Sequence, residues 1–266
     1  MLICCTLWLL GGVLGVRASP QTLGAPVLKW QNGGCRTTWC RSGWYASPAV
    51  ADLDGDGKPE IIWTDYRIVV LNGADGSDKW IVANPGGGRG WPGVALADIN
   101  HDGKPDIISG HSDGWVSVYQ ANGTPLAGWP RQVTPGSEIR SLAVGDVDGQ
   151  GTQTVLVCAT RSDNQWFWLD AAGNTRAGWP LQTDSNSTGY AAGCYNENVG
   201  LADLDGDGRL DMIGPSDVHY VVGYHDDGTP LRANSRYGQV NGLNKPWGRV
   251  GFAYDDAVEL RGYANC

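Results

Sequence analysis

The feature that most constrains the fold of this chain is a segment that occurs four times along it. Each copy has a short apolar run, an aspartate-rich loop and a second apolar run directly after the loop. The loops begin at Asp52, Asp98, Asp146 and Asp203. Self-similarity at a period of about 50 residues is typical of repeat architectures, in which each copy folds as one structural unit.

The rest of each copy predicts that the unit is made of β-strands. Runs of apolar residues, such as 67–71, 115–119 and 165–169, alternate with glycine-containing turns. Runs of this length between such turns form antiparallel hairpins, about four strands in each copy. A four-stranded unit cannot bury both faces alone, so neighbouring units have to stack around a common axis. We therefore expect an all-β fold, a β-propeller with about four to five four-stranded antiparallel blades in this chain.

The repeats also set the expected domain boundaries. Residues 19–46 form an N-terminal segment, in which 26–30 is expected to be a stray outer strand. The propeller repeats occupy the rest of the chain, with units at 47–92, 93–138, 139–195 and 196–246 and a partial unit at 247–266.

The composition excludes several classes of protein. Acidic residues outnumber basic ones 28 to 19, and the net charge of −9 leaves no basic face for nucleic-acid phosphates, so no nucleic-acid partner is expected. Glycine is abundant, at 40 residues, and methionine is rare, at 2, which argues against a helical bundle. A hydrophobic content of 41% is enough to build a core, so the chain is not disordered.

The first 18 residues predict export. Residues 1–18 form one apolar stretch, and Val16 and Ala18 are small residues at the −3 and −1 positions of a signal-peptidase site. We expect a secreted or cell-surface protein, extracellular or periplasmic, with no membrane span after the signal peptide is cleaved. An uncleaved anchor is the alternative.

Five cysteines remain after residue 18. Cys35 and Cys40 are close enough in sequence to clip a loop. Cys158 lies in an apolar run and is predicted to be a buried free thiol. Cys194 and Cys266 are candidates to pair with each other.

The repeated loops have the composition of a calcium site. Their pattern, Asp-x-Asp-Gly-Asp-Gly-x-x-Glu/Asp, puts carboxylates at positions 1, 3, 5 and 9, and Ca²⁺ takes six to eight oxygen ligands. The glycine at position 6 allows the loop to turn inward, and the carbonyl at position 7 is a further ligand. An EF-hand would place its closing Glu at position 12, where loop 1 has Trp63, and would flank the loop with helices.

We name these segments loop 1 (52–60), loop 2 (98–106), loop 3 (146–154) and loop 4 (203–211). Three of them are expected to bind Ca²⁺. Their expected ligands, with each Lys or Arg acting through its carbonyl, are Asp52, Asp54, Asp56, Lys58 and Glu60 in loop 1; Asp98, Asn100, Asp102, Lys104 and Asp106 in loop 2; and Asp203, Asp205, Asp207, Arg209 and Asp211 in loop 4.

Loop 3 is a weaker match to the pattern. It keeps Asp146 and Asp148, but Gln150 and Thr154 stand where the other loops have acids. It is therefore either a weak metal site or a metal-free turn.

These loops resemble the calcium loops of FG-GAP (VCBS-type) repeats, which occur in the propeller head of integrin α subunits and in many secreted bacterial proteins. The resemblance covers about residues 45–260. It implies a ring of typically seven blades, here incomplete, with Ca²⁺ in the loops of one rim. It also implies a module that binds proteins or glycans. The Phe-Gly signature is reversed at Gly251-Phe252, so the bacterial type fits better than the integrin type.

The sequence favours a secreted calcium-binding β-propeller that acts as a non-catalytic recognition or adhesion module for a protein or carbohydrate ligand. It leaves open that the chain is part of a larger polypeptide or assembly. The alternative is a propeller-type secreted polysaccharide-degrading enzyme, similar to a lyase, or an accessory domain of one. Residues 110–114 match the Gly-x-Ser-x-Gly nucleophile elbow, but they lie between two expected strands and not at a strand-to-helix turn.

Tryptophan is the other residue type that bears on ligand binding. Trp129 and Trp179 recur in the repeat, so we expect them to pack between blades. Trp39, Trp44 and Trp91 lie in glycine-rich connections and are candidate platforms for a sugar or a partner protein.

Overall fold

The computed structural model describes residues 25–32, 46–160, 165–182, 198–215 and 221–245. Several expectations fall outside these residues. They are the signal peptide at 1–18, the Cys35–Cys40 clip, the Cys194–Cys266 pair, Trp39, Trp44 and the partial unit at 247–266.

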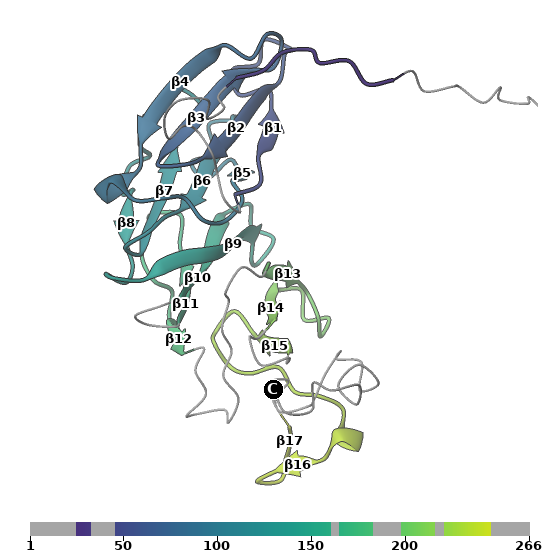
Figure 1. Ribbon diagram of the computed structural model, residues 1–266. Coiled ribbons are helices and arrows are strands. Elements are labelled where there is room, and N and C mark those ends of the chain that lie inside the picture. The colour runs from purple at the N-terminus through teal and green to yellow at the C-terminus, as the bar shows by residue number, and fades with distance from the viewer. Residues whose placement is uncertain (1–24, 33–45, 161–164, 183–197, 216–220, 246–266) are drawn as a thin grey trace, which may run out of the picture.

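Four antiparallel sheets, which we call blades 1 to 4, follow one another along the chain (Figure 1). Blade 1 contains β1 (Ala49–Ala51), β2 (Glu60–Thr64), β3 (Arg67–Asn72) and β4 (Asp78–Ala83). Blade 2 contains β5 (Ala95–Ala97), β6 (Asp106–Gly110), β7 (Trp115–Tyr119) and β8 (Arg131–Gln132). Blade 3 contains β9 (Glu138–Asp146), β10 (Gln153–Thr160), β11 (Gln165–Leu169) and β12 (Leu181–Gln182). Blade 4 contains β13 (Gly200–Ala202), β14 (Asp211–Pro215) and β15 (Val221–Tyr224).

The smaller elements lie between blades and after blade 4. They are two 3₁₀ turns, Pro85–Gly87 and Ser235–Tyr237, and a two-stranded hairpin of β16 (Gln239–Val240) and β17 (Leu243–Asn244).

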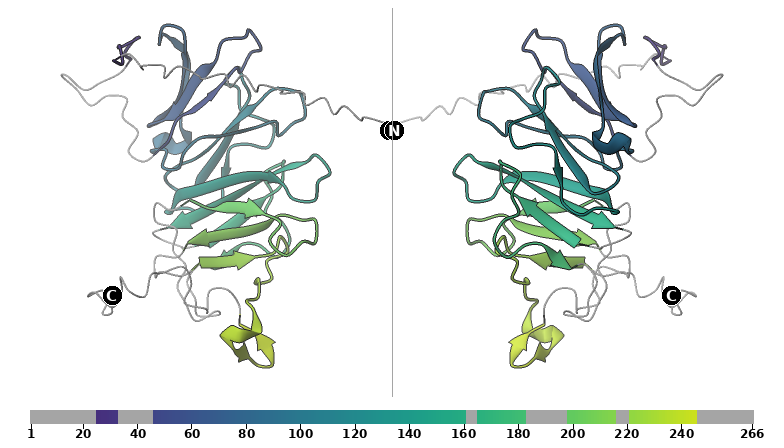
Figure 2. Two further views of the ribbon diagram at one scale, coloured as in Figure 1. Left: turned by 90° about the vertical axis from the view of Figure 1, so that its right-hand side faces the viewer. Right: turned by 90° about the vertical axis from the view of Figure 1, so that its left-hand side faces the viewer.

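The predicted fold class is confirmed. Strands pair in sequence order within each blade, as expected for hairpins joined by short turns. Figure 2 shows the blades stacked one after another, from blue blade 1 to green blade 4. Blades 1 and 4 lie at opposite ends of this stack, so the described blades form an open arc and not a closed ring.

Each interface between neighbouring blades has its own apolar core. Leu53, Ile62 and Val70 of blade 1 pack with Ile107 and Tyr119 of blade 2. The cores between blades 2 and 3 and between blades 3 and 4 are built in the same way. Blades 2 and 3 each pack against a neighbouring blade on both faces, so their central strands are mostly apolar.

A tryptophan reaches from each of the first three blades to the next. In every case the indole N–H donates to the carbonyl of the second residue in the turn that follows the third strand. The pairs are Trp80 with Ala121 at 3.0 Å, Trp129 with Ala171 at 3.0 Å and Trp179 with Asp226 at 2.8 Å. The expected packing role of Trp129 and Trp179 between blades is confirmed.

The N-terminal segment differs from expectation. Residues 25–32 form no strand, so the outer strand expected at 26–30 is not present among the described residues. The indole of Trp30 instead donates to the carbonyl of Gly73 at 3.0 Å, and the Asn32 amide donates to Asp78 Oδ1 at 3.0 Å. Gly73 is the first residue after β3, so Trp30 gives blade 1 a contact similar to the one that the other blades receive from a preceding blade.

Cys158 also differs from expectation. It is fully buried in β10, as predicted, but it is disulfide-bonded and not a free thiol. Its partner lies outside the described residues. The apolar run that contains Cys158 indicates burial but gives no sign of a disulfide bond.

Candidate metal centre

The four aspartate loops occupy equivalent places in the structure. Each loop connects the first and second strands of its blade, so all four lie at the same edge of the arc. The ninth residue of each loop belongs to the second strand, as in Glu60 of β2 and Asp106 of β6. An interaction that stabilises a loop therefore also holds the second strand of its blade in place.

The first aspartate organises each loop through backbone hydrogen bonds. Asp52 accepts from the N–H of Gly55 at 2.8 Å with Oδ1 and from that of Gly57 at 2.8 Å with Oδ2. Asp98 and Asp203 bind their own loops in the same way. Gly57 has φ of +82°, a backbone conformation that side-chain-bearing residues rarely adopt, which explains glycine at position 6.

The ninth residue is a buried carboxylate in loops 1, 2 and 4. Glu60, Asp106 and Asp211 are at most 2% exposed. One oxygen of each accepts the backbone N–H of position 2, at 2.8 Å from Leu53, 2.9 Å from Ile99 and 2.9 Å from Leu204. A buried anion is costly unless a positive charge or further donors compensate it, so the second oxygen needs a partner.

The structure brings several of the predicted ligands together. The carboxylate oxygens of Asp52, Asp54 and Glu60 lie within 4.8 Å of one another, and so do those of Asp203, Asp205 and Asp207. A third group adds a residue that the sequence did not indicate, because His225 joins Asp205 and Asp211 within the same distance.

Loop 1 contains an ammonium group at its acidic centre. Lys79 Nζ lies 2.6 Å from Asp54 Oδ2 and 2.8 Å from Glu60 Oε1. The hydrogen bond from Lys79 holds the pKa of Asp54 below its usual value. Sequence reasoning missed Lys79, which comes 19 residues after Glu60 and outside the loop pattern.

Loop 4 contains an imidazole at the corresponding place. His225 Nδ1 lies 3.0 Å from Asp211 Oδ1 and 3.8 Å from Asp205 Oδ2. Met212 pairs with Tyr224 across β14 and β15, so His225 stands opposite Asp211. The cross-strand register could have identified His225, but the loop pattern could not.

Loop 2 has neither of these groups. Among the residues that the structure describes, no cationic side chain contacts Asp106, and the acids of loop 2 do not converge as closely as those of loop 1. Burial raises the pKa of Asp106 above its usual value, and the charges of Asp102 and Asp98 raise it further. Loop 2 thus combines the hydrogen-bonded loop with a closing acid that no cationic side chain of the described residues compensates. These residues fit an oxygen-coordinated divalent cation.

In loop 3 the ninth residue forms hydrogen bonds within the blade, whereas the first aspartate still binds the backbone of the loop. Thr154, at position 9, donates its hydroxyl to the Gly145 carbonyl at 2.8 Å and accepts the Trp168 indole N–H at 2.8 Å. Asp146 Oδ2 accepts from the N–H of Gly151 at 2.6 Å, and within the described structure its buried Oδ1 has no hydrogen-bond partner. Position 9 of loop 3 therefore forms hydrogen bonds within its blade and supplies no carboxylate for a metal ion.

Asp226, in the turn after β15, joins loop 4 to blade 3. Its Oδ1 accepts from Arg209 Nε at 3.0 Å, and its Oδ2 accepts from Arg176 of blade 3 at 2.8 Å. The hydrogen bond from Arg209 is the main reason that the pKa of Asp226 is below its usual value. Blades 3 and 4 are thus held together by an ion-pair network beside the loop.

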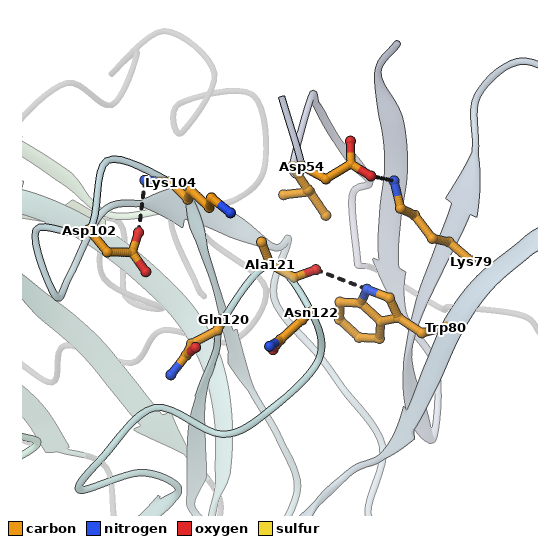
Figure 3. Close-up of a pocket in the computed structure, with 9 residues that line it drawn as sticks. Asp54, Lys79, Trp80, Asp102, Lys104, Gln120, Ala121 and Asn122 are labelled. Atoms are coloured by element: carbon orange, nitrogen blue, oxygen red, sulfur yellow. Dashed lines mark hydrogen bonds and ion pairs between the residues drawn. The ribbon is translucent and has the colours of Figure 1, made fainter. Parts of the chain in front are cut away.

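A hollow of about 440 Å³ lies beside loops 1 and 2, at the junction of blades 1 and 2 (Figure 3). Its wall contains carboxylate, ammonium and amide groups together with one indole. The lining residues are Leu53, Asp54, Lys79, Trp80, Asp102, Lys104, Gln120, Ala121 and Asn122.

The Gly-x-Ser-x-Gly segment and Trp91, which the sequence offered as a nucleophile motif and a ligand platform, make structural contacts. The Gly-x-Ser-x-Gly segment lies in the turn between β6 and β7, where Ser112 Oγ accepts the Trp91 indole N–H at 2.9 Å. His111 beside it is fully buried, and burial lowers its pKa to about 3. Trp91 is half-buried, and its ring stacks against the Arg140 guanidinium at 3.7 Å, so it is not a free platform.

Comparison with known proteins agrees with this geometry. Residues 98–157 and 146–214 match the model of the FG-GAP-like repeat. The matched residues include loops 2, 3 and 4 and the strands of blades 2 and 3 that follow the loops. No curated protein matches the sequence.

Three solved structures of similar fold share little sequence with this chain. The C-terminal domain of PilY1 from Pseudomonas aeruginosa matches with a TM-score of 0.52 and 16% identity, over 73% of this chain and 52% of that one. BamB from Moraxella catarrhalis matches with a TM-score of 0.44 and 20% identity, over 70% and 46%. BBS1N, crystallised in complex with ARL6DN, matches with a TM-score of 0.48 and 12% identity, over 72% and 54%. This chain therefore spans about half the length of these structures.

The described residues contain no helix long and apolar enough to cross a membrane.

Proposed function

We propose that this chain is a secreted calcium-binding β-propeller module that recognises a protein or a carbohydrate and is not itself a catalyst. The observation that carries the proposal is the closing acid of loop 2. Asp106 is buried and, in the part of the chain that the structure describes, has no cationic partner, while the rest of its loop is already folded around Asp98. A divalent cation would supply the missing positive charge.

The residues that would hold the ion in loop 2 are the predicted ones, namely Asp98, Asn100, Asp102, the carbonyl of Lys104 and Asp106. In loop 4 the corresponding set includes Asp203, Asp205, Asp207 and Asp211, with His225 beside it. Bound Ca²⁺ supplies positive charge that neutralises these carboxylates. The chain's own contribution is to connect each loop to the second strand of its blade, so that the loops form a rigid rim.

Two further observations support the extracellular part of the proposal. A disulfide at Cys158 is typical of proteins that fold in an oxidising compartment. Residues 1–18 have the features of a signal peptide.

The hollow at the junction of blades 1 and 2 supports a polar ligand. Its carboxylate, ammonium and amide groups suit the hydroxyls of a sugar or the backbone of a peptide (Figure 3). A glycan array and a pull-down against extracellular proteins, each in calcium and in EDTA, test this role directly. Saturable, calcium-dependent binding is expected, and it should weaken in Asn122→Ala, which changes the hollow but no metal ligand. Turnover of an acidic polysaccharide by the purified chain would overturn the non-catalytic assignment.

A further inference from the structure

Loop 1 has the complete aspartate pattern, as loop 4 does, but its acidic centre already holds a positive charge. The ammonium of Lys79 bonds to Asp54 and to Glu60 at the same time, at 2.6 and 2.8 Å. Only 22% of the Lys79 side chain is exposed, so this pair is not a loose surface contact. The other oxygen of Glu60 accepts the Leu53 N–H at 2.8 Å. Both oxygens of the closing acid are therefore engaged within the chain.

The backbone of blade 1 is built to place Lys79 there. The pairing of β3 with β4 shifts register between Val70 and Leu71, which pair with Trp80 and Asp78. Lys79 is the extra residue of this bulge. An extra residue of this kind redirects its side chain, and here the side chain reaches loop 1.

The other blades lack this residue. In blade 2, Tyr119 pairs with Pro125, and the next residue, Leu126, donates its N–H to the Val118 carbonyl at 2.9 Å. Blade 3 repeats the arrangement with Leu169 and Thr175. Because consecutive residues continue the pairing in these blades, no side chain takes the position of Lys79.

We propose that Lys79 is a built-in cation that replaces calcium in loop 1. An ammonium and a divalent cation cannot share the same two carboxylate oxygens, because the cations repel each other and each requires those oxygens as ligands. Loop 1 therefore does not fit the ion, and its closing acid is neutralised without metal, whereas loops 2 and 4 depend on it. This inference rests on the proposed calcium binding of loops 2 and 4 and corrects the expectation that loop 1 is equivalent to them.

Calcium titration of the full chain by calorimetry, with stoichiometry as the readout, tests the inference. Lys79→Met should bind roughly one more ion per chain than the wild type, because it frees the acids of loop 1. Asp54→Asn should leave the stoichiometry of the wild type unchanged but should remove the additional ion in the Lys79→Met background. Lys29→Met is the matched control, since Lys29 is an exposed lysine whose ammonium donates to the Gly73 carbonyl and, in the described structure, contacts no loop carboxylate, and it should behave as the wild type.

The possible outcomes separate this inference from the proposed function. If Asp54→Asn lowers the stoichiometry of the wild type by one ion, loop 1 binds calcium despite Lys79 and the inference is wrong. The same holds if folded Lys79→Met binds no additional ion. If the wild type and every variant bind no calcium, the proposed function itself fails. The Asp54→Asn experiment needs no Lys79 variant, so it decides the question even if Lys79→Met does not fold.

Discussion

Loops 1 and 2 have nearly the same sequence and the same backbone hydrogen bonds, but they neutralise their closing acids differently. In both loops the first aspartate accepts backbone N–H groups from positions 5 and 6, and the ninth residue accepts the N–H of position 2. Glu60 then pairs with Lys79, whereas no cationic side chain of the described chain contacts Asp106. The aspartate pattern thus specifies the shape of the loop, and residues outside it decide what neutralises the loop.

Loop 4 shows an intermediate arrangement. His225 approaches Asp211 from the neighbouring strand, but an imidazole is uncharged unless it is protonated, so it compensates the acid less completely than an ammonium does. Among the described residues, the group beside the closing acid is a permanent cation in loop 1, a titratable donor in loop 4 and no cationic group in loop 2. We expect dependence on added metal to increase in the same order.

The largest expected effect is that of calcium on the free energy of unfolding. Each loop that binds an ion only in the folded state should gain about 2.7 kcal/mol when calcium exceeds its dissociation constant 100-fold. Chemical denaturation in EDTA and in calcium should therefore differ by about 5 kcal/mol if loops 2 and 4 both bind.

Variants of the two closing acids sharpen this measurement. Asp106→Ala should remove about half of the calcium-dependent gain, whereas Glu60→Gln should leave the gain unchanged although it loses the ion pair with Lys79. An equal reduction in both variants would show that loops 1 and 2 are equivalent after all.

The second largest expected effect is the loss of stability in the absence of metal when Lys79 is replaced. In EDTA, Lys79→Met should lower the free energy of unfolding by about 2–4 kcal/mol, because it leaves the buried carboxylate of Glu60 without its cation. Lys29→Met should change the free energy of unfolding by less than about 0.5 kcal/mol, since Lys29 is exposed. Loss of the same stability in both variants would mean that Lys79 acts through general surface charge.

Much of the fold was predictable because its determinants are local. The alternation of apolar runs and glycine turns predicted the hairpins, and the aspartate pattern predicted which turn of each blade carries the acids. The recurrence of Trp129 and Trp179 predicted that they pack between blades. These features depend on residues close together in sequence, so a pattern repeated four times was enough to reveal them.

The features that were missed depend on how distant segments are placed. Lys79 reaches loop 1 only because of a bulge, and His225 meets Asp211 only because of the register between β14 and β15. The apolar run at 26–30 looked like a strand, but there the contact to blade 1 is made by the indole of Trp30 and not by a strand ladder. Cys158 was correctly placed in the core, but burial gave no indication of its disulfide.

The smallest expected effect is the pH dependence of the two loops in EDTA. The pKa of Asp106 is raised from 3.8 by burial, so the folded state keeps this proton to a higher pH than the unfolded chain does. Between these two pKa values the folded state binds more protons, so stability falls as the pH rises above about 4. The pKa of Asp54 is lowered by the hydrogen bond from Lys79, so its contribution has the opposite sign and is lost as the pH falls below 3.8.

Carboxyl chemical shifts measured by NMR across this range would separate the two residues. In the wild type Asp54 should titrate below 3.8 and Asp106 above it. Lys79→Met should move the midpoint of Asp54 upward and leave that of Asp106 in place, because no contact joins Lys79 to loop 2 in the described structure. A midpoint of Asp106 at or below that of Asp54 would show that loop 2 has a cationic partner of its own, and the contrast between the loops would no longer hold.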